Sequence, residues 1–327
     1  MPQTQTATAR PSPFDQMQRA VDIVNTSPHP DNKISATLFN RKFSVSSTNF
    51  WPAPILDKFG TEERVGNASG TVHAETACIM AAPGPTEGAS LCVTDPFCPN
   101  CAKNMAEAGI RTIYIDHKGF KKDFVARRAH AFANMSMQIC EKAGINVFEL
   151  WRKEERLIPI LKFSPSYVPP EDNPAERQPA EQYSKDSFCT AIRAIQDKHH
   201  DHKIAAALTK NEAGHYEIIT VRTHAAIGYT MKADLPEIEN PQGKYSFMQG
   251  PINRLLMQAA RHGLKIQDGF LYASQVPTAR EQVNMVGAAL HEIYVGDLSM
   301  ARDEYALQAM KVMQDTGILS FNACAES

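Results

Sequence analysis

An internal repeat limits the fold of this 327-residue chain more than any other feature of its sequence. The segment "KISATLFN" from Lys33 corresponds to "KIAAALTK" from Lys203, and each follows a stretch with helical spacing. The segment from Ser90 aligns without a gap with "FLYASQVPTAREQVNMVGAALHEIYVGD", so that Asn104 matches Asn284. Any two segments of mixed helix and strand share some of this likeness, but the matching order favours a duplication. The chain is therefore predicted to contain two copies of one fold.

A proline-rich stretch separates the two copies. Residues 164–186 hold five prolines among charged and polar residues, a composition that cannot propagate a helix or a central strand. This stretch is interpreted as a semi-rigid linker. The predicted domains are residues 1–163 and residues 187–327.

Within the first copy, apolar and β-branched runs alternate with helical patterns. "KISATLF" and "KFSVSS" read as a hairpin, because "NR" between them suits a tight turn. "HAETACIMAA" and "CPNCAKNMAEAG" read as helices, the second closed by Gly109, and "ASLCVT" and "TIYID" read as strands. The predicted fold class is α/β, with a mixed sheet between two helix layers in each copy.

Charge and composition exclude several classes of protein. The net charge of −2 argues against non-specific coating of nucleic acid, which depends on many phosphate contacts. Residues 1–165 have 19 Lys and Arg against 16 Asp and Glu, a net charge of +3, and the remainder has 15 against 20, a net charge of −5. A phosphorylated ligand is therefore expected to bind the first half rather than the second. No apolar run is long enough for a membrane span and no secretory signal is recognisable, so a cytoplasmic protein is expected. The odd cysteine count suits reduced thiols rather than a disulfide framework.

Four residues of the first copy have the spacing of a metal centre. His73 and Glu75 lie at one predicted helix start, and Cys98 and Cys101 at the next. Cysteines three residues apart share one face of a helical turn, and the helix N-terminus favours their thiolates. Two sulfurs and one imidazole leave the fourth position of tetrahedral zinc open, where water loses a proton near about pH 7. A structural zinc clip and a coincidence of residue types are the alternatives.

The pattern H-A-E followed by P-x-C-x-x-C resembles the signature of the zinc-dependent cytidine and deoxycytidylate deaminase superfamily. The resemblance implies that His73, Cys98 and Cys101 hold Zn²⁺ and that Glu75 carries protons without binding the metal. It also implies an α/β/α fold of the cytidine deaminase type. One departure is Phe97, which stands between Pro96 and the first cysteine, where the family has proline directly before it.

Weaker candidates for substrate binding lie around this motif. Asn49 ends the second strand, where members of the family place an asparagine that contacts sugar or base, although a turn asparagine is the alternative. Ala74 lies between the predicted ligand and the acid, and Phe97 is either a ring against which the base packs or a core aromatic. Lys118 opens a basic loop that extends to Arg128 and that equally suits a solvated helix face.

The segment between Phe50 and Gly70 is an insertion without cysteine or histidine, so it supplies no second zinc site; it could form a lid over the pocket.

In the second copy, Thr278 and Glu281 align with the two cysteines. When a two-residue deletion is allowed, Pro251 and Asn253 align with the histidine and the glutamate. The second copy is thus predicted to be catalytically dead and to complete the pocket wall or provide a face for homodimerisation.

The leading hypothesis is a zinc-dependent hydrolytic deaminase of a cytosine nucleoside or nucleotide that releases ammonia. The first alternative is a base deaminase acting on RNA, such as transfer RNA, or on single-stranded DNA, which only the basic loop supports. The second alternative is a non-catalytic interaction module that zinc merely stabilises.

Overall fold

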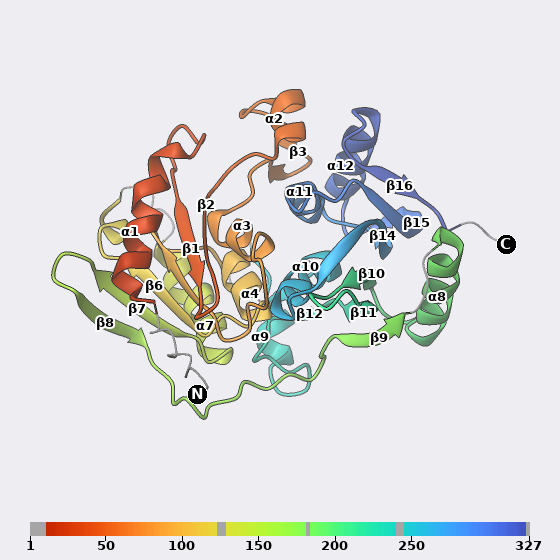
Figure 1. Ribbon diagram of the computed structural model, residues 1–327. Coiled ribbons are helices and arrows are strands. Elements are labelled where there is room, and N and C mark those ends of the chain that lie inside the picture. Colours follow the sequence, from red (N-terminus) through yellow and green to blue (C-terminus); the bar gives the residue numbers. More distant parts are fainter. Residues whose placement is uncertain (1–10, 123–128, 181–183, 240–244, 325–327) are drawn as a thin grey trace, which may run out of the picture.

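The computed structural model describes residues 11–122, 129–180, 184–239 and 245–324. Two six-stranded sheets stand side by side, one in each copy (Figure 1). The first sheet has the order β2-β1-β5-β6-β7-β8 and the second has the order β16-β15-β14-β10-β11-β9. No helix among these residues is long and apolar enough to cross a membrane.

The first copy follows the predicted alternation of helix and strand. Its strands are β1 (Ser35–Phe39), β2 (Ser44–Thr48), β5 (Ser90–Val93), β6 (Thr112–Asp116), β7 (Asn146–Trp151) and β8 (Arg156–Leu161). Its helices are α1 (Pro13–Ile23), α3 (Ala74–Met80), α4 (Pro99–Glu107), α6 (Ala129–Ala131) and α7 (Met137–Lys142), with short turns η1 (Val24–Thr26), η2 (Gly119–Lys121) and the π-helical η3 (Phe132–Ser136). The hairpin predicted at "NR" is confirmed, because β1 pairs with β2 in antiparallel register.

The second copy repeats this order. Its strands are β10 (Ile204–Lys210), β11 (Tyr216–Arg222), β14 (Lys265–Val276), β15 (Glu292–Ala301) and β16 (Ser320–Asn322), with the small pair β12 (His224–Ala225) and β13 (Met248–Gln249). Its helices are α8 (Lys185–Lys198), α9 (Leu235–Glu239), α10 (Pro251–Arg261), α11 (Ala279–Gly287) and α12 (Glu304–Asp315). In both sheets the two central pairings after the hairpin are antiparallel and then parallel. The predicted duplicated α/β fold is therefore confirmed.

The two sheets turn corresponding faces toward each other. On β1, Ala36 and Leu38 point into the large core that spans both copies, whereas Phe39 packs on the other side with α1. On β10, Ala205 points into the shared core and Ala206 packs toward α8. This alternation follows from the two-residue period of a strand. It places α1 and α8 outside and the helices α3, α4, α10 and α11 between the sheets (Figure 1).

The proline-rich segment joins the second sheet. Its residues Glu176–Ala180 form β9, which pairs with β11 at the sheet edge. Pro179 lies opposite Glu217 there, and an edge strand accepts proline because one of its sides needs no ladder hydrogen bond. Helix α8 then begins at Lys185.

A buried ion pair fastens the two copies together. Arg254 of α10 is 1% exposed and contacts the Glu107 carboxylate of α4 at 2.8 Å. Gln258 donates to the same oxygen, and Arg254 also donates to the carbonyl oxygens of Arg222 and Asn173. A guanidinium and a carboxylate are tolerated in a core only when they are paired and further hydrogen-bonded. The buried pair therefore fixes how α4 and α10 pack against each other.

The insertion between the hairpin and α3 reaches the second copy. It forms α2 (Ala53–Phe59) and a small hairpin of β3 (Arg64–Val65) and β4 (Ala68–Ser69). Gly66, at the tip of that hairpin, has φ +56°, and a Cβ there would approach the carbonyl oxygen of Tyr305 and the side chain of Ala279. The tip thus packs against α11 and α12.

Candidate active site

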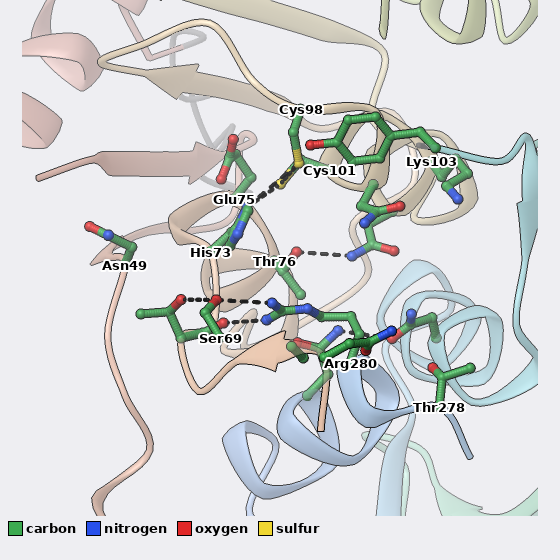
Figure 2. A pocket seen from close by; sticks show the side chains of 18 of the residues that line it. Asn49, Ser69, His73, Glu75, Thr76, Cys98, Cys101, Lys103, Thr278 and Arg280 are labelled. Carbon is green, nitrogen blue, oxygen red and sulfur yellow. Dashed lines mark hydrogen bonds between the residues drawn. The ribbon is translucent and has the colours of Figure 1, made fainter. Parts of the chain in front are cut away.

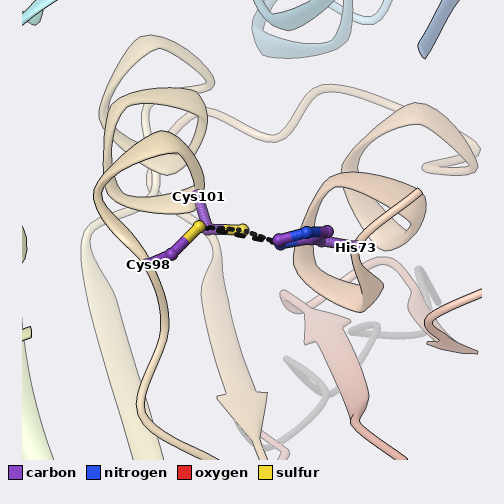
Figure 3. Close-up of side chains that lie close together, drawn as sticks. All are labelled: His73, Cys98 and Cys101. Atoms are coloured by element: carbon purple, nitrogen blue, oxygen red, sulfur yellow. Dashed lines mark hydrogen bonds between the residues drawn. The ribbon is translucent and has the colours of Figure 1, made fainter. Parts of the chain in front are cut away.

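Two helix N-termini converge on the predicted metal ligands. His73 is the N-cap of α3 and Cys98 is the N-cap of α4, with Pro99 at the first helical position, where its missing N–H costs nothing. Cys101 lies one turn into α4. The order and spacing seen in the sequence therefore place all three side chains together (Figure 3).

The three side chains have the separations of a tetrahedral zinc set. The His73 Nδ1 atom lies 3.2 Å from Cys101 Sγ and 3.7 Å from Cys98 Sγ, and the two sulfurs are 3.6 Å apart. Bonds of about 2.3 Å to sulfur and about 2.0 Å to nitrogen at tetrahedral angles require separations of about 3.5 to 3.8 Å. The two separations from Cys98 Sγ lie in this range, and the distance from His73 Nδ1 to Cys101 Sγ is about 0.3 Å shorter, so the donor set suits zinc after a small outward shift of the side chains. Within the described residues it is the single group of three His, Cys, Asp or Glu side chains close enough for a metal.

The electrostatics of the cluster favour a thiolate. A hydrogen bond shared with Cys101 holds the pKa of Cys98 well below the usual range of a thiol, and the His73 ring acts in the same direction. Elsewhere in the copy, burial raises the pKa of Cys78 to about 12. Cys98 thus readily forms the thiolate that ligates a cation, whereas Cys78 does not.

Glu75 is buried beside the cluster. Its side chain is 3% exposed, it lies in the first turn of α3, and it lines the same cavity as the three ligands. Burial raises the pKa of Glu75, and the opposing charge of His73 lowers it. A carboxyl group in this environment can take up and release a proton next to a reacting group.

A cavity of about 630 Å³ opens onto these residues between the two copies (Figure 2). Asn49, Ala74 and Glu75 line it on the side of the first copy. Asn49 Oδ1 accepts from Ser27 Oγ and from the backbone N–H of Ile34, and its Nδ2 donates to the carbonyl oxygen of Asn32. Its amide is held in place, with one N–H not used in these bonds.

Two predicted substrate contacts lie elsewhere. Phe97 is 2% exposed and packs edge-on against Phe132, with 5.4 Å between ring centroids, and it does not line the cavity. Lys118 lies on the exposed turn after β6 and is likewise outside the cavity lining. In the same loop Lys122 forms an ion pair with Asp95, 2.7 Å apart. The rest of the basic loop, residues 123–128, lies outside the described residues.

The second copy supplies the opposite wall of the cavity, a contribution that sequence reasoning had proposed without naming its residues. The wall consists of Tyr245, Ser246, Asn253, Thr278, Arg280, Asn284, Arg302 and Asp303. Arg280 reaches across to the first copy, where it donates to the Thr71 carbonyl oxygen and to Ser69 Oγ (Figure 2). Lys103 of α4 reaches the other way, to the carbonyl oxygens of Ser246 and Met248.

At the starts of α10 and α11 the second copy has no histidine or cysteine, and the predicted alignment was one residue off at α10. When the helix starts are matched, Gly250 stands opposite His73 and Ile252 opposite Glu75. A pair of equivalent hydrogen bonds supports this register: Asn104 donates to Thr76 in the first copy and Asn284 to Asn253 in the second.

A carboxylate occupies the corresponding place in the second copy. Glu281 aligns with Cys101, and its Oε1 accepts from the backbone N–H groups of Ile252 and Asn253 at the start of α10. Its other oxygen accepts from Thr278 at the start of α11, at 2.9 Å from the N–H and 2.8 Å from the hydroxyl. Glu281 therefore joins the two helix starts that a metal would join in the first copy.

Known proteins resemble this chain over part of its length. The "uncharacterized deaminase in luxG 3′ region" of Aliivibrio fischeri is 31% identical over 132 residues, which are 40% of this chain and 87% of that protein. Two solved structures of the dCMP deaminase from cyanophage S-TIM5, an apo form and a complex with dCMP and dUMP, are each 18% identical to it with a TM-score of 0.31. They match 41% of this chain and 94% and 93% of their own chains, respectively. No family model matches the sequence.

Proposed function

This chain belongs to the deaminase family, and we propose that it is a zinc-dependent hydrolytic deaminase of a cytosine nucleoside or nucleotide. The proposal rests on one observation: the His73, Cys98 and Cys101 donors and the buried Glu75 lie together on the lining of one cavity between the two copies. A zinc ion bound by this set supplies a Lewis acid that makes water nucleophilic at neutral pH.

The protein's own groups provide the proton transfers. In the proposed reaction the C4–N4 bond of cytosine is replaced by a C4–O bond from water. Glu75 takes a proton from the attacking water, delivers it to N3, and then transfers a proton to the departing amine, which leaves as ammonia. The Glu75 side chain is buried and held in the first turn of α3, so these transfers would start from a group in a fixed position.

Ammonia release tests the proposal. Purified protein loaded with zinc is incubated with cytidine, deoxycytidine and their 5′-monophosphates, beside a Glu75→Gln variant of equal zinc content. We expect release from at least one substrate and a loss of about 10² to 10⁴ in kcat for the variant, the range typical of a missing general acid–base. Equal behaviour of the parent and the variant would reject the assignment and favour a zinc-stabilised interaction module.

A further inference from the structure

Among the side chains that line the cavity, cationic groups outnumber carboxylates. Four cations line it, Arg64, Lys103, Arg280 and Arg302, and two carboxylates, those of Glu75 and Asp303. The Asp303 carboxylate caps α12, where it accepts from the backbone N–H of Ala306 at 3.0 Å. At the other end of the cavity, a bound Zn²⁺ ion with the thiolates of Cys98 and Cys101 would add no net charge. The cavity lining is therefore cationic.

Three of these cations contact neutral oxygens rather than carboxylates. Lys103 and Arg280 bond to backbone carbonyls and a hydroxyl, and Arg64 approaches the carbonyl oxygen of Asn67. In the part of the chain that the structure describes, none of the four forms an ion pair with a carboxylate, unlike Arg254 in the interdomain core. A cation drawn out of bulk water is strongly stabilised by an anion of opposite charge. The cavity thus suits an anionic ligand.

Two of these cations belong to the second copy and lie at the starts of neighbouring elements. Arg280 is in the first turn of α11, and Arg302 directly follows β15, before α12. Arg302 is exposed, so its guanidinium is free to turn toward a ligand. A guanidinium offers paired N–H donors that match the oxygens of a phosphate.

We propose that the second-copy wall, at Arg302 with Arg280 beside it, is a subsite for the phosphate group of a nucleoside monophosphate. This inference rests on the proposed function, which places the base at the zinc ligands of the first copy. A cavity of about 630 Å³ lies within the range of small-molecule sites and accommodates both ends of such a ligand. The copy without metal ligands then selects the phosphorylated form of the substrate.

Binding of reaction products tests the subsite without turnover. The dissociation constants of uridine 5′-monophosphate, deoxyuridine 5′-monophosphate and the two nucleosides are measured calorimetrically on the zinc-loaded full chain. We expect a monophosphate to bind at least tenfold more tightly than its nucleoside. In Arg302→Gln this ratio falls below about threefold, whereas Arg302→Lys keeps part of it. Arg41→Gln, a change in the exposed turn of the β1–β2 hairpin, is the matched control and keeps the parental ratio.

The outcomes separate the subsite from the proposed function. A parental ratio near one, or a ratio that Arg302→Gln leaves unchanged, overturns the subsite even if ammonia is released from cytosine compounds. An Arg302-dependent ratio without any ammonia release supports the subsite and rejects the proposed function. Failure of every nucleoside and nucleotide to bind overturns the subsite, and the ammonia assay alone then decides on the proposed function. Thermal unfolding of each variant shows whether a lost ratio reflects a misfolded protein.

Discussion

The Arg280 guanidinium, from the copy without metal ligands, donates a hydrogen bond to the carbonyl oxygen of Thr71 in the other copy. Thr71 precedes His73 by two residues, and a second bond from Arg280 holds Ser69 at 3.1 Å. The backbone that presents the imidazole to the zinc set is thus fixed from the other half of the molecule.

Removal of this contact is expected to weaken the metal site. Arg280→Gln frees the 69–71 segment, and we expect zinc affinity to fall on the order of tenfold, the effect typical of an outer-shell partner. Competition with a chromogenic chelator measures it. Arg41→Gln again serves as the control, and a variant at Arg280 with parental zinc affinity would show that the contact does not position His73.

Chelation is expected to loosen the first copy selectively. A metal that binds only the folded state stabilises that state by mass action, so its removal should increase amide exchange at the starts of α3 and α4. The starts of α10 and α11, which Glu281 joins, should retain their protection and so provide an internal control. Hydrogen exchange with mass spectrometry, before and after dialysis against dipicolinate, makes the comparison. Equal deprotection of both copies would contradict it.

Loss of the Glu107 carboxylate should be strongly destabilising. Glu107→Ala leaves the buried guanidinium of Arg254 without its anion, and breaking a buried pair in this way costs about 3 to 5 kcal/mol. Urea unfolding measures the free energy. The control, Asp315→Ala, removes an exposed partner of Lys311 and should leave the unfolding midpoint nearly unchanged. A midpoint shift of similar size in both variants would mean that the buried pair is not critical.

The hairpin tip should tolerate no side chain at Gly66. Gly60 and Gly66 of the insertion both have positive φ, +64° and +56°, so an alanine at either adds backbone strain on the order of 1 to 3 kcal/mol. At Gly60 a Cβ would meet nothing within 4 Å, whereas at Gly66 it would clash with the Tyr305 carbonyl. We expect Gly66→Ala to unfold at a lower temperature than Gly60→Ala and to lose more activity. Equal effects would show that the tip does not dock on α12.

Short-range sequence patterns predicted much of the fold and the side of the site that belongs to the first copy. The His73, Cys98 and Cys101 cluster was predictable because His73 and Cys98 lie at helix starts, whose positions follow from short-range sequence patterns. The duplication was predictable because the matched segments keep their order.

The cavity wall was less predictable because it depends on how the two copies pack. Arg280 and Arg302 carry no motif, and their position relative to His73 is set by the contact of α4 with α10. The proline-rich segment was interpreted as a connector, and no local pattern indicated that β11 would offer it a free edge. Phe97 lies within the motif and Lys118 follows it, but neither lines the cavity, because Phe97 is buried in the core and Lys118 is exposed to solvent.

The Glu281 carboxylate gives the second copy an anchor made of the polypeptide itself. A covalently attached anion cannot dissociate, so we expect the shape of this half not to depend on whether a metal is bound. A molecule that has lost its ion would therefore keep one side of its binding chamber assembled. Reactivation would then require only that the remaining two helix starts recapture an ion, rather than that the whole chain refold.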